Sequence, residues 1–175
     1  MSAQDRFDND SDESDDSNED KDSDDESDEF DDNEDMSVQD RFVTACGDRK
    51  DLSLVMTLLP TIDVNKVSSD GYTALSLAMW YNHTEIVQLL LDSDQIILGT
   101  VESDDYSTVL HDACYMNSEA SIRLYLGHKD CNPAIVTMKN VNGYTAEMEA
   151  DKFGNTECSS LIREYLARHT AQVLG

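Results

Sequence analysis

Basic side chains, proline and long apolar runs are all scarce in this chain of 175 residues. It has 12 Lys and Arg against 38 Asp and Glu, and only 2 Pro. Phosphate binding needs clustered Lys and Arg, and none occurs, so we expect no nucleic-acid partner and no membrane binding. We also expect neither a membrane span nor a secretory signal, because the apolar runs are too short for either. These absences favour a cytoplasmic or nuclear protein.

Catalytic and metal-binding motifs are also missing. Four cysteines lie far apart without a C-x-x-C pair, namely Cys46, Cys114, Cys131 and Cys158. We expect them to be free, buried thiols, and we expect no metal or other cofactor. The chain has neither a Gly-rich phosphate loop nor H-E-x-x-H. One catalytic hypothesis remains, in which His111 activates Cys114 three residues later, but otherwise we expect no enzyme.

Half of the acidic residues lie in the first 35 positions. This stretch has 19 Asp and Glu against Arg6 and Lys21, which gives a charge of −17, and it has few apolar side chains. Such a segment cannot offset the entropy cost of ordering, so we expect residues 1–39 to form a disordered acidic arm. The other 19 acids and 10 bases leave −9 on the rest of the chain. Basic proteins therefore remain candidate partners.

Two further features concern this arm. MSAQDRF at Met1 recurs as MSVQDRF at Met36, which indicates a local duplication or an alternative start. Ser17 and Ser23 each have an acid three residues later, the spacing that an acidophilic kinase such as casein kinase 2 recognises. Each phosphate would add about 1.5 to 2 negative charges. The alternative is an unmodified arm that only keeps the protein soluble.

One phrase recurs three times after the arm. DGYTALSLA begins at Asp70, DYSTVLHDA at Asp105 and NGYTAEMEA at Asn142, with their threonines 35 and 37 residues apart. A polar break and a second apolar stretch follow each phrase, as in HTEIVQLLL from His83. The pattern predicts a turn, a short helix, a turn and a longer helix, with Gly at positive φ and Thr capping the first helix.

An earlier pair of apolar faces, between Phe42 and Pro60, lacks the Gly-Thr turn and is predicted to be an amino-terminal cap. A pair of this size cannot bury its apolar face alone, so the four pairs must stack.

These residues resemble the ankyrin repeat, whose pattern D-x-x-G-x-T-P-L-H-x-A precedes a helix carrying I-V-x-L-L-L. TVLHDA and IVQLLL are the best matches, and the likeness covers roughly residues 40–167. It implies an all-α solenoid of about four helix pairs with short β-turn hairpins, in a domain of residues 40–170. The first and last pairs are the least regular, and we expect the last to be a partly solvated cap. The departures are Ala74, Val109 and Ala146 for Pro, Tyr106 for Gly, and Glu147 for Leu.

The resemblance also bears on two polar residues. His111 matches the histidine of the T-P-L-H motif, which implies hydrogen bonds that tie neighbouring turns together rather than catalysis. Asn65 ends a D-V-N triplet whose asparagine is sometimes hydroxylated in the family. The simpler interpretation of Asn65 is a residue that fixes a tight turn.

Family members contact partners mainly through turn tips and the exposed edge of the first helix, which line a concave face. Tyr and Trp are enriched among residues that each contribute more than about 2 kcal/mol to binding. The alternative is that these side chains only cover apolar surface. We expect a monomeric, non-enzymatic module that binds a protein partner, or else an acidic arm that acts as a chaperone or competitor for basic proteins such as histones. The residues implied at the helix edge are Trp80, Tyr81, Tyr115, Met116, Lys152 and Phe153, and those at the tips are Ser69, Asp70, Tyr72, Asp104, Asp105, Ser107, Asn142 and Tyr144.

Overall fold

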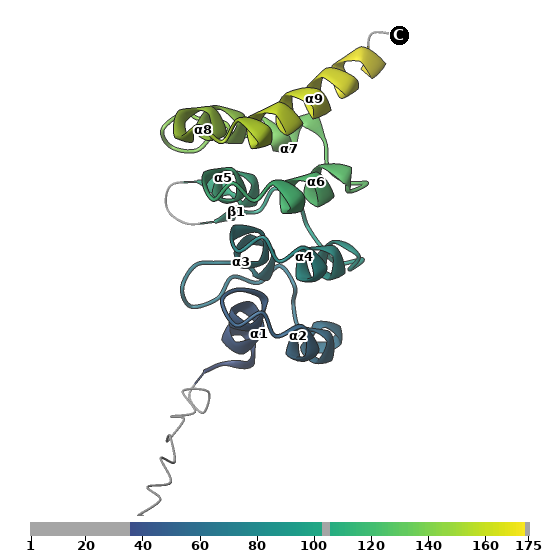
Figure 1. The fold of residues 1–175 in the computed structure, drawn as a ribbon. Coiled ribbons are helices and arrows are strands. Elements are labelled where there is room, and N and C mark those ends of the chain that lie inside the picture. Colours follow the sequence, from purple (N-terminus) through teal and green to yellow (C-terminus); the bar gives the residue numbers. More distant parts are fainter. Residues whose placement is uncertain (1–35, 103–105, 174–175) are drawn as a thin grey trace, which may run out of the picture. The chain divides into compact units, whose positions relative to one another are not determined.

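The computed structural model describes residues 36–102 and 106–173, in which four helix pairs follow one another (Figure 1). The first helices are α1 (Val38–Cys46), α3 (Ala74–Trp80), α5 (Val109–Tyr115) and α8 (Ala146–Phe153). The second helices are α2 (Leu52–Leu58, followed by the 3-10 turn η1 at Leu59–Thr61), α4 (Thr84–Leu91), α6 (Glu119–Gly127) and α9 (Thr156–Val173). A short α7 (Pro133–Val136) precedes the last pair.

Each helix packs on its counterpart in the next pair. First helices contact first helices in chain order, and second helices contact second helices, so the pairs stack in two columns (Figure 1). This confirms the predicted all-α solenoid. Helix α1 begins two residues before the expected domain start at Asp40, and α9 extends beyond residue 170. The expected acidic arm, with Ser17 and Ser23, lies almost wholly outside the described residues.

Local capping explains where the first helices begin. Oγ1 of Thr73 accepts a hydrogen bond from the N–H of Ser76 at 3.1 Å, and Oγ1 of Thr145 accepts one from the N–H of Met148 at 3.3 Å. These bonds satisfy donors that the first turn of a helix leaves free. The predicted capping role of the repeated threonine is therefore confirmed at these two positions.

The second copy of the repeated heptapeptide forms the start of α1. Gln39 Nε2 donates to the backbone oxygens of Asp63 at 3.4 Å and Lys66 at 3.1 Å, and Phe42 is completely buried. The position at which the two copies differ is Val38, whose side chain is 52% exposed. A chain starting at Met36 would therefore keep every one of these contacts.

The turns before the first helices use the positive-φ backbone that the pattern predicts. Gly71 has φ +89° and Gly143 has φ +76°. In the third pair Tyr106 takes this conformation, with φ +57°. Tyr106 lies between the two strands of an antiparallel hairpin, in which β1 (Val101–Glu102) pairs with β2 (Ser107–Thr108). The expected short hairpin is confirmed here, with a bulky side chain in a backbone conformation that favours glycine.

Replacing Tyr106 with glycine is expected to stabilise the protein by about 0.5–1 kcal/mol. The left-handed conformation costs a non-glycine residue about 1–2 kcal/mol, and the greater freedom of glycine in the unfolded chain cancels part of that gain. Urea denaturation measures the change. Gly71→Ala is the matched control, because no atom lies within 4 Å of an added Cβ and only the backbone penalty remains. It should destabilise; a Tyr106→Gly variant no more stable than the parent would contradict the argument.

The turn inside each pair also repeats. Lys50, Asn82, Asn117 and Gly154 all have positive φ, from +46° to +77°. Asn82 additionally joins two repeats, because its Oδ1 accepts from both N–H (3.1 Å) and Oγ–H (2.8 Å) of Ser121. Asparagine suits this position because it tolerates left-handed backbone and carries a hydrogen-bonding side chain.

The last pair closes the stack with a polar outer surface. Glu147, at the place where the family has Leu, is half-buried and accepts from Arg163 Nε of α9 at 2.8 Å, and Asp151 pairs with the same guanidinium. The inner face of α9 is apolar, with Ile162 fully buried and Tyr165 3% exposed. Glu147 therefore leaves α8 intact, because the neighbouring helix supplies a partner for its charge.

Candidate functional site

The His111–Cys114 pair is closed to catalysis. His111 is 1% exposed, and both ring nitrogens are engaged. The N–H of Thr108 donates to Nδ1 at 3.2 Å, and Nε2 lies 3.0 Å from the backbone oxygen of Tyr144 in the next repeat. Burial raises the pKa of the Cys114 thiol far above its ordinary value, so the nucleophilic thiolate is suppressed. The predicted structural role of His111 is confirmed.

The remaining thiols and Asn65 also have structural surroundings. All four cysteines are buried and free, as predicted, and burial raises the pKa of Cys46 to about 12 and that of Cys158 to about 11. Asn65 bridges two repeats: Nδ2 donates to Gln95 O at 2.6 Å, and Oδ1 accepts from Ile97 N–H at 2.8 Å. These bonds give Asn65 a structural role between repeats.

A buried carboxyl links the second and third repeats where a histidine links the third and fourth. The position equivalent to His111 is Ser76, which is too short to reach the next turn. Glu102 of β1 reaches back instead, and Thr73 Oγ1–H donates to its Oε1. The Glu102 side chain is 2% exposed, and burial raises the pKa of its carboxyl, opposed by hydrogen bonds from Ser76 and Thr73.

Glu102→Gln is expected to stabilise the protein at neutral pH by on the order of 1 kcal/mol, with a smaller gain as the pH falls. Because the folded-state pKa lies above the ordinary value of 4.5, the contribution of wild-type Glu102 to stability is fully present below that value and is lost as pH rises through the folded pKa. Gln keeps an acceptor for Thr73 without the charge. Urea unfolding of both proteins between about pH 5 and pH 8 measures the difference.

Asp151→Asn provides a control of opposite sign. A hydrogen bond from Arg163 lowers the pKa of Asp151 below its ordinary value of 3.8, so the stabilising contribution of Asp151 is fully present above that value and is lost only as pH falls through the folded pKa. Between about pH 5 and pH 8, Asp151→Asn should therefore destabilise the protein by an amount that does not change with pH. A Glu102→Gln difference that stays flat with pH would contradict the prediction.

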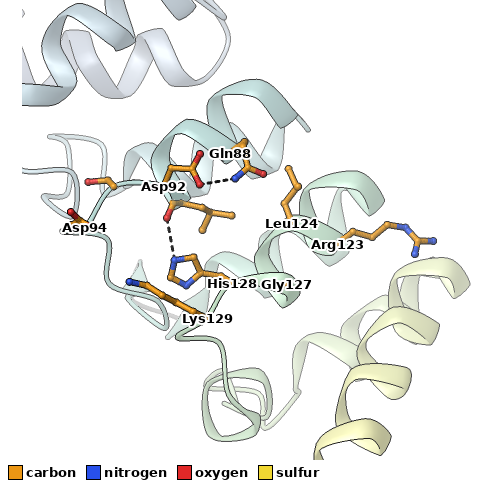
Figure 2. Close-up of a pocket in the computed structure, with 10 residues that line it drawn as sticks. Gln88, Asp92, Asp94, Arg123, Leu124, Gly127, His128 and Lys129 are labelled. Carbon is orange, nitrogen blue, oxygen red and sulfur yellow. Dashed lines mark hydrogen bonds between the residues drawn. The ribbon is translucent and has the colours of Figure 1, made fainter.

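A hollow of about 460 Å³ opens between the carboxyl ends of α4 and α6 (Figure 2). Its polar groups bind one another or the backbone. Gln88 Nε2 donates to Asp92 at 2.8 Å, and His128 Nε2 lies 3.1 Å from a backbone oxygen of α4. Arg123 extends away from Asp92 and pairs with Glu119 at 2.7 Å. Leu91 and Leu124 are the large apolar side chains among the residues that line the hollow, so it differs from small-molecule sites, whose lining is mainly apolar.

Two further searches concern metals and membranes. In residues 36–102 and 106–173, no three His, Cys, Asp or Glu side chains converge as metal ligands would. Across the same ranges, every helix is too short or too polar for a membrane crossing.

Most residues implied at the helix edge lie on the surface. Tyr81, Tyr115, Met116 and Phe153 are 46%, 47%, 41% and 46% exposed. Trp80 is half-buried. The edge therefore presents large apolar side chains from three successive repeats.

The implied tip residues are less uniform. Ser107 is a correction: it lies within the paired strand β2, both residues of which are buried, and it is 5% exposed. Tyr144 is half-buried, and Asp104 and Asp105 lie outside the described residues. The remaining tip residues are exposed, namely Ser69, Asp70, Tyr72 and Asn142. Lys152, at the helix edge, is also exposed.

Three rings form what we call the aromatic row: Trp80, Tyr115 and Phe153. The centroids of Trp80 and Tyr115 are 5.9 Å apart, and those of Tyr115 and Phe153 are 4.7 Å apart with nearly perpendicular planes. These distances and angles are favourable for aromatic pairs. The row joins α3, α5 and α8, so three repeats contribute to one continuous surface.

Met148 and Glu149 of α8 were missed from the sequence. Met148 is 45% exposed although it occupies the repeat position of the buried His111, because no further repeat packs over it in the described part of the chain. Glu149 shares the equivalent position with Asp112 of α5, and both are half-buried. Aligning the repeats position by position would have revealed the two carboxylates.

A comparison with known families agrees with this architecture. A family model for ankyrin repeats, in three copies, matches residues 42–137, which is more than half of the chain. Ankyrin repeats are generally protein–protein interaction modules and are typically non-enzymatic. Helices α8 and α9 follow the matched region and continue the same stacking. The repeated capping threonines, the stacked helix pairs and the family match together show that the chain belongs to the ankyrin repeat family.

Proposed function

We propose that this protein is a non-enzymatic adaptor that captures a protein partner on the concave face lined by its first helices. The aromatic row is the observation that supports this most directly. Its rings touch one another across three repeats, yet Tyr115 and Phe153 each keep almost half of their surface exposed. Tyr81 and Met116 extend the exposed apolar area beside them. Side chains of this kind dominate the centres of protein interfaces.

Partner capture from native lysate tests the proposal. The full chain is compared with a variant carrying Trp80→Ala, Tyr81→Ala and Tyr115→Ala, and bound proteins are eluted in a salt series. We expect the triple variant to lose partners that the wild-type chain retains at high salt, because apolar contacts are not screened. A control carries Val38→Ala, Met56→Ala and Ile97→Ala, which remove three exposed apolar side chains away from the row. Equal capture by all three proteins would overturn the proposal.

The composition of the first 35 residues favours a second candidate function. With 19 acids and 2 bases, the arm could act as a chaperone or competitor for basic proteins such as histones. A version starting at Met36 discriminates the two functions, since it keeps all the contacts of α1. Partners lost with the arm, released by salt and indifferent to the aromatic substitutions would assign the function to the arm. For either function we propose a monomer in the cytoplasm or nucleus.

A further inference from the structure

A cation of this chain, Lys152, lies over the rings at one end of the proposed contact surface. Lys152 Nζ is 4.9 Å from the centroid of Tyr144 and 5.2 Å from that of Phe153. Aromatic faces attract cations at these distances. Tyr115, in the middle of the row, is 47% exposed and therefore offers ring surface that a cation from a partner can use.

Carboxylates accompany the row on the same helix faces. Asp112 stands three residues before Tyr115, and Glu149 stands three residues before Lys152 and four before Phe153. Residues at these spacings are neighbours on one face of a helix. The two acids occupy equivalent repeat positions on the adjacent helices α5 and α8.

Glu149 is incompletely satisfied within the protein. Its Oε2 has no hydrogen-bond partner in the described residues and almost no exposed area, although the side chain as a whole is half-buried. Its charge also contributes to the raised pKa of Cys114, after the larger effects of burial and of Cys158. A carboxylate in this condition costs free energy, which a donor from a partner would recover after a small rotation of the side chain.

The nearby bases are already committed. Arg163 pairs with both Glu147 and Asp151, and Lys152 lies over its own rings. The chain from residue 36 onward also carries 19 acids against 10 bases. A positively charged segment is therefore favoured at long range as well as in contact.

Resting on the proposed function, we infer that the partner segment which docks on the aromatic row presents an arginine between apolar residues. The guanidinium stacks on Tyr115 and donates to the carboxylate of Glu149. Arginine fits better than lysine, because its planar group can stack on a ring and donate to a carboxylate at the same time. The apolar neighbours of that arginine contact Tyr81 and Met116.

Peptide binding to the full-length chain tests this inference. The probe is a fluorescein-labelled peptide of alternating Arg and Leu, with matched peptides in which Lys or the neutral isostere citrulline replaces Arg. Fluorescence anisotropy at about 150 mM salt gives each Kd. We expect the Lys peptide to bind about threefold more weakly than the Arg peptide, and the citrulline peptide about tenfold more weakly. The measurements are repeated on a full-length chain whose Asp and Glu at positions 5–35 are replaced by Asn and Gln, to remove binding by the arm.

Substitutions on the row locate the binding. Tyr115→Leu keeps the apolar volume but removes the ring face, and Glu149→Gln removes a charge; each should weaken the Arg peptide about fivefold and leave the citrulline peptide unchanged. Lys152→Gln should strengthen Arg-peptide binding by removing a repelling charge. Glu164→Gln, on the exposed surface of α9, is the control for overall charge.

Two results would overturn the inference, and they differ in their consequence for the proposed function. If the citrulline peptide binds as tightly as the Arg peptide and the aromatic triple substitution abolishes both, the contact surface stands and the arginine requirement is wrong. If the Arg peptide binds the triple variant as tightly as the parent, the row is not its docking surface.

Discussion

Replacing Tyr125 with alanine is expected to lower the free energy of unfolding by about 3–5 kcal/mol. Tyr125 lies in α6 and is the largest completely buried side chain in the described part of the chain. Its hydroxyl accepts a hydrogen bond from the N–H of Gly99 at 3.2 Å. Helix α6 packs between α4 and α9, so the cavity would open where three repeats meet. Because each repeat is stabilised mainly by its neighbours, damage at this junction weakens the whole stack.

Urea denaturation measures this loss as a lower midpoint at unchanged slope. Tyr125→Phe is the matched control, since it keeps the ring and removes only the hydroxyl that faces Gly99. Its expected cost is about 1–1.5 kcal/mol, the value of one buried hydrogen bond. If the alanine and phenylalanine variants were equally stable, the ring would contribute nothing beyond its hydroxyl and the packing argument would be wrong.

Replacing His111 with alanine is expected to cost about 2–4 kcal/mol. Nδ1 accepts from Thr108 N–H, and Tyr144 O can only accept, so Nε2 must donate to it. The ring is thus held in the neutral tautomer that carries its proton on Nε2. Its removal leaves a buried N–H at the start of α5 and a carbonyl in the next turn without their partner, in addition to an empty volume.

Comparison with His128→Ala separates two contributions of His111, namely the burial of its ring and its hydrogen bond to the next repeat. His128 also bonds a carbonyl of the preceding repeat, that of Leu91, and its side chain is 9% exposed, but its ring lines the open hollow between α4 and α6. Its loss should cost about 1 kcal/mol, because water can replace the missing bond. Equal costs for the two histidines, measured by the same urea titrations, would show that the burial of His111 adds no stability.

The repeat period, the helix order and the capping threonines could be predicted because each depends on residues close in sequence. Thr73 and Thr145 act on N–H groups three residues away, and Gly71 and Gly143 bend their own backbone. These local preferences agree with the global fold, which is typical of natural sequences. The pattern was weakest at Tyr106, where the hairpin imposes positive φ on a residue that disfavours it.

Contacts between repeats were beyond the sequence pattern. Glu102 reaches Thr73 across 29 residues, and Asn82 reaches Ser121 across 39. When a residue differs from the consensus at its repeat position, as Ser76 does in place of histidine, a side chain from another repeat can supply the missing hydrogen bond. The periodicity of the sequence does not predict such a compensating contact, because the compensating residue belongs to a different turn.

The sequence by itself determined that the chain is a stack of ankyrin repeats with large apolar residues at the edge of the first helix in its last three helix pairs. Only the tertiary structure decided which of these residues are accessible. It buries Ser107, leaves Met148 exposed and brings Trp80, Tyr115 and Phe153 into one row. The physical reason is that the exposure of a side chain in a solenoid depends on the repeat packed beside it, whereas the helix that carries it depends on its own neighbours in sequence.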